Sequence, residues 1–245
     1  MDPVRSDSFN FSDELWQATE STYRAILDHP FLLGLADGTL PRAAFRHFVV
    51  QDSHYLRDYA RALAVCAAKA PTEADVRAFA DDAVGALAAE QEMHAGFLND
   101  LGLDDPVLND PGPDVSGLDG PGAPVDDAEV LPTTRAYTSY LLATVYGGSF
   151  AEGLAAVLPC YWIYARVGEA LLRTSSPDPL YARWIESYGD ESFQAVVRRV
   201  LKLTDRVGAE LSPVERRRAV GHFATTSRYE WMFWDAAWRG ERWPV

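Results

Sequence analysis

One cysteine of this chain follows a proline inside an apolar and aromatic stretch. Residues 158–164 read LPCYWIY, which places Cys160 directly after Pro159. A proline inside a helix removes an amide donor and crowds the preceding turn, so we expect a kinked or loosened helix there. A cysteine beside such a break suits the wall of a pocket. A buried cysteine is more commonly an inert small hydrophobic side chain, and this stretch alone leaves both interpretations open.

A glutamate in a later segment lies among aromatic residues. Residues 229–234 read YEWMFW, so Glu230 has Thr226, Phe233 and Trp234 at helical spacing. A solvated helix face is one interpretation, but these neighbours favour a carboxyl group that is at least partly buried. Burial raises the pKa of a carboxyl group, which can then act as an acid or a base near neutral pH.

A second carboxylate lies on an apolar stripe earlier in the chain. Asp52 and Tyr55 are three residues apart and share one face of the expected helix, close to Phe48 and Val49. An aspartate in such surroundings is either a hydrogen-bonded structural group or a contact for a ligand. The spacing does not choose between them.

Helical signals dominate the elements that must position these residues, and no segment shows the sustained alternation typical of strands. Ser12 is expected to cap the first helix, and Pro41 to occupy the first position of a long one. The short break at Pro71 and Thr72 predicts an antiparallel hairpin of two long helices. The expected helical segments are 13–27, 41–70, 73–101, 133–146, 148–173, 178–187, 190–209 and 213–239.

Residues 102–131 differ from the rest of the chain. They contain five prolines, eight acidic residues and no basic residue. Helices of the same style resume at Thr133, so we interpret this stretch as an exposed acidic loop within one domain that spans residues 1–245. The prediction is an all-α, single-domain bundle of seven or eight helices.

The formal net charge of −14 argues against nucleic-acid binding, which needs a basic surface. Abundant aspartate and scarce lysine fit a halophilic host or a GC-rich genome equally well. No stretch approaches the roughly 20 apolar residues of a membrane span, and the first residues do not resemble a secretory signal. Cys66 and Cys160 form neither a disulfide framework nor a zinc motif. We therefore expect a cytoplasmic protein without a membrane or nucleic-acid partner.

Four stretches taken together resemble the TenA (thiaminase II) family, whose fold is the heme-oxygenase-like helical bundle. The resemblance extends from about Phe11 to Trp238, with an acidic loop that is longer than usual. The matching stretches are QDSHYLRDYARAL at 51–63, LPCYWIYARVG at 158–168, WIESYGDESF at 184–193 and YEWMFWDAAW at 229–238.

This resemblance implies roles for eight residues. Cys160 matches the nucleophile of the cysteine-containing branch, and Glu230 matches the acid/base glutamate. Asp52 matches the aspartate that holds the amino group of a pyrimidine, and Phe233 matches the ring that stacks on it. The other substrate-binding positions are tyrosines, namely Tyr55, Tyr137, Tyr164 and Tyr188. Neither a cofactor nor a metal ion is expected.

The implied reaction is hydrolysis of 4-amino-5-aminomethyl-2-methylpyrimidine to the 5-hydroxymethyl compound, a step of thiamin salvage, with thiamin cleaved by the same chemistry. The cysteine adds to the ring, the ring expels the leaving group, and water replaces it. The matched pocket offers Cys160 carboxylates and phenols but no cation, so we expect a neutral thiol at rest. Relatives are commonly tetramers, and a homotetramer is expected here.

Two other functions remain open. A non-haem di-iron oxidase of the same fold is one, because Glu90 and His94 are four residues apart and could form half of a metal site. The last helices contain no Glu-x-x-His pair to complete it, and a packing hydrogen bond is the preferred interpretation. A non-catalytic protein that binds pyrimidines or thiamin is the other, and it would not need Cys160. Haem oxygenase activity is not expected, because the first helix lacks a proximal histidine.

Overall fold

The computed structural model describes residues 10–93 and 128–245, with the backbone alone for residues 89–93. Every regular element in these ranges is an α-helix, which confirms the all-α prediction. None of the helices in the described ranges is long and apolar enough to cross a membrane. The helices are α1 (Phe11–Leu27), α2 (Pro30–Asp37), α3 (Arg42–Lys69), α4 (Glu73–Met93), α5 (Pro132–Gly147), α6 (Phe150–Leu172), α7 (Pro179–Gly189), α8 (Glu191–Gly208) and α9 (Pro213–Arg239).

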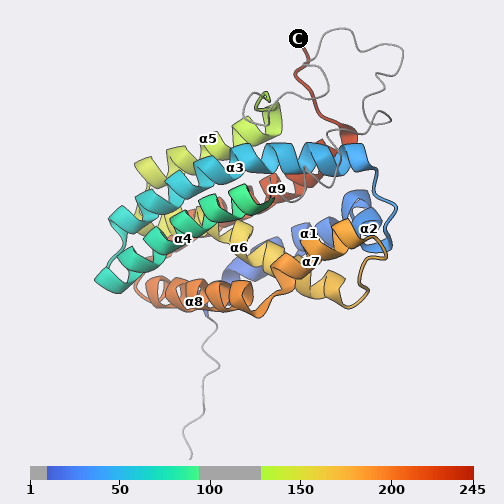
Figure 1. Ribbon diagram of the computed structural model, residues 1–245. Coiled ribbons are helices and arrows are strands. Elements are labelled where there is room, and N and C mark those ends of the chain that lie inside the picture. The colour runs from blue at the N-terminus through green and yellow to red at the C-terminus, as the bar shows by residue number, and fades with distance from the viewer. Residues whose placement is uncertain (1–9, 94–127) are drawn as a thin grey trace, which may run out of the picture.

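Helix α6 occupies the middle of the bundle (Figure 1). It packs against α9, α7, α5, α8 and α3. Every residue from Gly153 to Pro159 is buried, as expected for a helix that is apolar on all sides. The helix continues through Pro159 to Leu172, although this proline cannot donate a backbone hydrogen bond.

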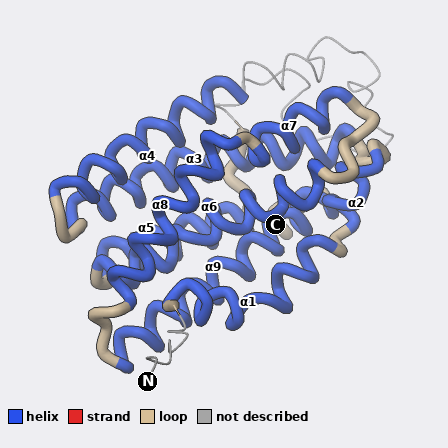
Figure 2. The backbone as a smooth tube through the Cα atoms, turned by 90° about the horizontal axis from the view of Figure 1, so that it is seen from below, coloured by secondary structure: helices blue, strands red, loops and turns tan. Residues whose placement is uncertain are grey.

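Helices α3 and α4 form the predicted antiparallel hairpin and lie along each other for most of their length (Figure 2). The Thr72 hydroxyl accepts a hydrogen bond from the Asp75 amide at 3.2 Å, which starts α4 directly after the break. Pro41 is the residue before α3 rather than its first residue. The expected continuation of α4 to about Leu101 lies outside the described residues.

The first helix begins earlier than the sequence analysis predicted. Its cap is Asn10, which forms a reciprocal capping box with Asp13, and not Ser12. Ser12 lies inside α1, where its amide donates to Asp205 of α8 at 2.8 Å. An asparagine two residues earlier offers the same acceptor chemistry as the serine, so the two caps could not be distinguished by residue type.

Helix α2 was not among the expected elements. His29 caps it by accepting a hydrogen bond from the Phe31 amide at 3.1 Å, and Pro30 occupies its first position. Gly38 ends the helix in the left-handed conformation with φ of 80°. The helix has only eight residues and lacks a polar face, so it has no helical periodicity to detect.

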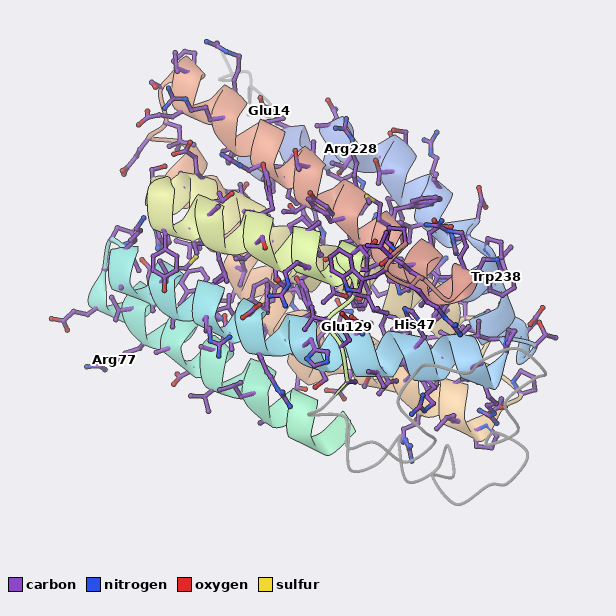
Figure 3. The ribbon with its side chains drawn as sticks, turned by 90° about the horizontal axis from the view of Figure 1, so that it is seen from above. Glu14, His47, Arg77, Glu129, Arg228 and Trp238 are labelled. Carbon is purple, nitrogen blue, oxygen red and sulfur yellow. The ribbon has the colours of Figure 1, made fainter. Side chains whose placement is uncertain are left out.

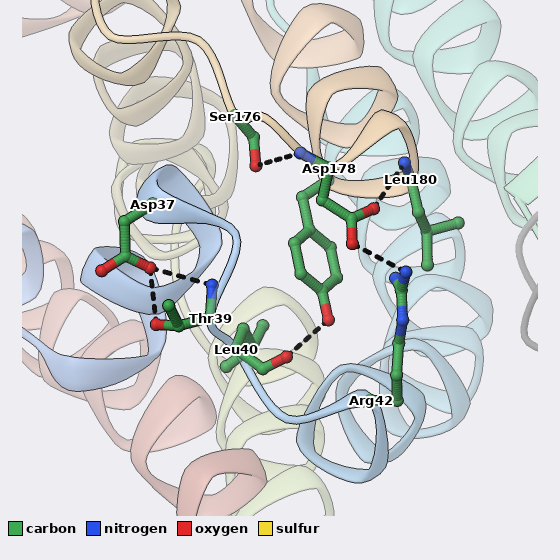
Figure 4. Close-up of polar contacts among 8 residues, drawn as sticks. Asp37, Thr39, Leu40, Arg42, Ser176, Asp178 and Leu180 are labelled. Atoms are coloured by element: carbon green, nitrogen blue, oxygen red, sulfur yellow. Dashed lines mark hydrogen bonds and ion pairs between the residues drawn. The ribbon is translucent and has the colours of Figure 1, made fainter.

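The turn after α2 is fixed to the start of α7 (Figure 4). Arg42 donates to the Asp178 carboxylate at 2.7 Å, and the Tyr181 hydroxyl donates to the Leu40 carbonyl at 2.6 Å. Asp178 also caps α7 by accepting from the Leu180 amide at 2.9 Å. These contacts hold α7 against the bundle and so fix where its aromatic side chains lie.

The last residues of the acidic stretch are held against α3. The Gln51 side chain donates to the Glu129 carbonyl at 2.9 Å and accepts from the Leu131 amide at 3.0 Å. Glu241 accepts from the Thr133 amide and hydroxyl at 2.9 and 2.8 Å, which fixes the first turn of α5. Figure 3 shows Glu129 beside α3 at this point. Residues 102–127 of the expected acidic loop lie outside the described residues.

Candidate active site

Side chains from five helices meet around the thiol of Cys160. This thiol interacts electrostatically with Glu230, Tyr55 and Asp52, and Tyr188 interacts with Asp52, Cys160 and Glu230. The structure thereby brings all eight predicted residues together, while their roles remain predictions. The contributions are Asp52 and Tyr55 from α3, Tyr137 from α5, Cys160 and Tyr164 from α6, Tyr188 from α7, and Glu230 and Phe233 from α9.

Helix α3 presents one face to the site because its polar residues follow helical spacing. Asp52 and Tyr55 are three residues apart, and Tyr59 follows one turn later. The rings of Tyr55 and Tyr59 stack with centroids 5.5 Å apart. The Tyr55 ring also lies 4.8 Å from the Tyr137 ring and 5.8 Å from the Phe233 ring. One buried tyrosine therefore links three of the helices that supply the site.

Glu230 is buried, which resolves the choice between a solvated and a desolvated carboxyl. The Tyr137 hydroxyl donates to Glu230 Oε1 at 2.6 Å. Burial raises the pKa of Glu230 to about 8, the Tyr137 hydrogen bond opposes that shift, and the Asp52 charge adds to it. At neutral pH the carboxyl is therefore mostly protonated and able to donate a proton.

Cys160 is a neutral thiol at rest, as the sequence analysis expected. Burial raises the pKa of the thiol well above its ordinary value, and the charges of Glu230 and Asp52 raise it further. The hydroxyls of Tyr55 and Tyr59 act in the opposite direction by stabilising the thiolate. Cys160 as a whole residue is half-buried, whereas Tyr55 and Glu230 are buried.

The Tyr55 hydroxyl acts on both the Cys160 thiol and the Tyr137 hydroxyl. It completes no hydrogen bond of standard geometry with the other described residues, yet it stabilises the anionic forms of both Cys160 and Tyr137. Tyr137 in turn donates to Glu230. Tyr55 is therefore close to both the thiol and the Tyr137 hydroxyl that donates to Glu230.

Aromatic rings form the remaining walls. Phe233 packs edge-on against Phe48 with centroids 5.6 Å apart. On the other side, the Tyr164 ring lies 4.8 Å from Tyr188 and 5.3 Å from Trp234. Flat, rigid rings around two carboxyl groups and a thiol are typical of a site for a small planar ligand with polar edges.

Comparison with known proteins gives the family of this chain. Residues 16–115 and 123–240 match the model of the TENA/THI-4/PQQC family. The chain belongs to this family. It is 33% identical over 233 residues to the aminopyrimidine aminohydrolase of Bacillus subtilis, which covers 95% of this chain and 92% of that protein.

Solved structures of the TENA/THI-4/PQQC family share the fold. A TenA homologue from P. horikoshii OT3 superposes with a TM-score of 0.78 at 30% identity, covering 94% of this chain and 99% of that one. A Shewanella denitrificans domain described as having a heme oxygenase-like fold superposes with a TM-score of 0.58 at 15% identity, covering 93% and 91%. The predicted heme-oxygenase-like bundle is thereby confirmed.

The di-iron alternative for this TENA/THI-4/PQQC family member depended on Glu90 and His94. The side chains of both residues lie outside the described part of the structure. Within the described part, no group of three or more histidine, cysteine, aspartate or glutamate side chains is arranged to hold a metal ion.

Two tyrosines near Cys160 were not among the predicted site residues. Tyr59 is four residues from Tyr55, and this spacing places it on the same face of α3. Its hydroxyl donates to the Val157 carbonyl of α6 at 2.9 Å. Tyr161 follows Cys160 directly, and its hydroxyl donates to Asp82 of α4 at 2.8 Å. No pattern in the sequence indicated a partner 79 residues away.

Proposed function

We propose that this protein is an aminopyrimidine aminohydrolase of the thiaminase II type, a hydrolase that acts in thiamin salvage. Its substrate is 4-amino-5-aminomethyl-2-methylpyrimidine, and its product is the 5-hydroxymethyl compound. One observation carries the proposal. A neutral thiol lies beside a carboxyl group with a pKa of about 8, and a second buried carboxyl group lies near both of them among aromatic rings. Similarity to the Bacillus subtilis aminopyrimidine aminohydrolase supports the same conclusion.

The substrate ring is held by its face and by its polar edge. Phe233 stacks on the pyrimidine, and the tyrosines Tyr55, Tyr164 and Tyr188 enclose it. Asp52 is buried and accepts from the exocyclic amino group while pairing with the adjacent ring nitrogen. This placement brings the opposite side of the ring toward Cys160.

Cys160 acts as a nucleophile because water cannot readily displace an amine from the side-chain carbon. Sγ forms a bond to a ring carbon, and a ring nitrogen takes up a proton from Glu230. The thiol proton passes through Tyr55 and Tyr137 and returns Glu230 to its protonated state. The electron-rich ring then expels ammonia from the side-chain carbon. Water adds to that carbon, and the carbon–sulfur bond breaks to restore the aromatic ring and the thiol.

Replacement of Cys160 separates an enzyme from a binding protein. Cys160→Ser retains nearly the same size, so affinity for the pyrimidine should change little, while an alcohol is a far weaker nucleophile than a thiol. We expect near-complete loss of hydrolysis. Glu230→Gln should lower the rate by about 10²–10⁴, because an amide cannot exchange the proton. The double variant should lose much less than the two single losses combined, since the residues act as a unit.

Steady-state kinetics with the aminomethylpyrimidine, with and without a chelator, provide the measurement. Hydrolysis by the serine variant at the wild-type rate would exclude a covalent adduct at Cys160. Binding without turnover by the wild-type protein would favour the non-catalytic alternative. Chelator-sensitive activity together with stoichiometric iron would favour the oxidase.

We also propose a cytoplasmic homotetramer that binds neither nucleic acid nor membranes. Both cysteines are free, which suits a reducing compartment, and the net charge of −14 opposes contact with nucleic acid. Exposed apolar side chains on α2 and α9, including Leu33, Met232 and Trp238, offer surface for subunit contacts. Light scattering of the purified protein gives the mass directly, and a mass of about 27 kDa would contradict the tetramer.

A further inference from the structure

Three side chains from three helices form a polar network next to the proposed nucleophile. The Tyr161 hydroxyl of α6 donates to Asp82 Oδ2 of α4 at 2.8 Å. Arg199 of α8 donates to Asp82 Oδ1 and Oδ2 at 2.6 and 2.8 Å. Tyr161 is buried, and the Asp82 side chain is only 9% exposed. Tyr161 therefore has its hydroxyl fixed by a carboxylate that is itself held by two charge-assisted bonds.

The network contacts the segment of α6 in which Pro159 removes a backbone hydrogen bond. Pro159 has no amide hydrogen, so the helix lacks one backbone hydrogen bond within the turn that carries Cys160. Lateral contacts must then fix how the residues after Pro159 are oriented. Two such contacts flank the thiol. Tyr59 donates to the Val157 carbonyl before the proline, and Tyr161 bonds to Asp82 after it.

The two contacts are also joined to each other. Val157 and Tyr161 are four residues apart and lie on one side of α6. The rings of Tyr59 and Tyr161 meet edge to face with centroids 5.8 Å apart. Cys160 lies between these two attachment points along the helix. Its direction is therefore set from both sides of the proline.

We propose that Tyr161, anchored by Asp82 and Arg199, is a positioning residue that aims the Cys160 thiol at the substrate ring. The proposal rests on the proposed role of Cys160 as nucleophile. Because the resting thiol is not ionised, it must lose its proton while it attacks the ring. Its reactivity therefore depends on a position from which proton transfer and attack can occur together. A misplacement of about 1 Å can cost about 100-fold in rate.

A second pair of residues provides a matched control for the docking of the same helices. Arg206 of α8 donates to both carboxylate oxygens of Asp75 of α4 at 2.7 Å. In both pairs the same two helices are joined, one guanidinium nitrogen donates to both carboxylate oxygens, and the side chains are partly buried. Within the described residues, no hydrogen bond or ion pair joins the Asp75 pair to α6. Loss of this pair weakens the α4–α8 contact without acting on Cys160.

The test compares Tyr161→Phe with Arg206→Met in the full chain. Tyr161→Phe removes one hydroxyl and keeps the ring against Tyr59. We expect kcat for the aminomethylpyrimidine to fall at least about tenfold, with KM nearly unchanged because the groups that hold the ring are intact. Arg206→Met should leave kcat unchanged. Asp82→Asn, which still accepts from Tyr161, should retain more activity than Asp82→Ala.

Different results test the proposed function, the nucleophile and the positioning role of Tyr161. A wild-type protein without hydrolysis would contradict the proposed function, and an active Cys160→Ser variant would contradict the nucleophile. With both of those intact, a Tyr161→Phe variant with wild-type kcat would overturn the positioning role. Equal losses of kcat in Tyr161→Phe and Arg206→Met would also overturn it, because they would reduce the effect to helix docking. Circular dichroism and melting temperatures verify that each variant is folded.

Discussion

At the scale of single residues, the site combines acidic groups that the protein interior keeps from ionising. Glu230 and Cys160 both have pKa values above their ordinary range, chiefly because they are buried. The aromatic neighbours of Glu230 indicated its burial from the sequence. Its hydrogen bond from Tyr137 was not predictable, because the two residues are 93 positions apart on different helices.

The pH dependence of the reaction should report Glu230. The pKa values of Cys160 and Tyr55 lie well above their ordinary values, so Glu230, with a pKa of about 8, is the group of this site that titrates in the mildly alkaline range. Below about pH 8 the carboxyl is protonated and can donate, and above it the acid is lost. We expect kcat/KM to fall as the pH rises through 8. The Glu230→Gln variant should not show this fall. A rate that increases over the same range would instead assign the carboxylate as a base.

Asp52→Asn should weaken binding of the pyrimidine. The amide keeps the size of the side chain but loses the charge and presents donors to the substrate's amino group. The loss should be about 1.5–3 kcal/mol for a charge-assisted hydrogen bond. Calorimetric titration of the folded variant measures it, with Asp58→Asn, a half-buried residue two turns further along α3, as a control. Unchanged affinity would remove Asp52 from the site.

At the scale of helices, the sequence predicted elements with a clear apolar stripe and missed what depends on tertiary contacts. The α3–α4 hairpin followed from long apolar patterns and a short connection. Helix α2 was missed because it is short and has no polar face. The network of Asp82, Arg199 and Tyr161 was missed because its members are far apart in the chain, and a charged residue on a helix predicts no particular partner.

The first turn of α5 depends on a residue that follows α9. Glu241 accepts two hydrogen bonds from Thr133, one turn before Tyr137. Glu241→Ala should lower the free energy of unfolding by about 1–3 kcal/mol, because two donors lose a charged acceptor. Urea denaturation measures this change, and Glu186→Ala, at an exposed position on α7, serves as the control. Equal stability of the two variants would contradict a structural role for this contact.

At the scale of the whole molecule, the outstanding property is the excess of acid. The chain has 36 acidic and 22 basic side chains, and the described basic residues are engaged in several pairs with acids of other helices, as in Arg199–Asp82 and Arg216–Glu14. The resemblance of four sequence stretches to the TenA family predicted the heme-oxygenase-like bundle. The composition alone predicts neither the fold nor the kind of host.

If the acidic surface suits a salt-rich host, added salt should stabilise the protein. Screening of carboxylate repulsion predicts a melting temperature that rises from low salt to about 1 M sodium chloride, where the Debye length is about 3 Å. Differential scanning fluorimetry follows the transition, with sucrose as a control for effects that are not electrostatic. A flat or falling melting temperature would favour a GC-rich genome as the source of the composition.

The groups that keep the Cys160 thiol neutral also predict which ligands the site will reject. Among the described residues, no lysine, arginine or histidine is a leading cause of the pKa shifts of Cys160, Glu230 or Tyr188, whereas Asp52 raises the pKa of all three. A phosphate ester placed there would meet like charge without a counterion, which costs several kcal/mol. We therefore expect the phosphate ester of the hydroxymethyl product to compete at least about tenfold more weakly than the free alcohol. An enzyme built this way can work in the presence of phosphorylated pyrimidines without being occupied by them.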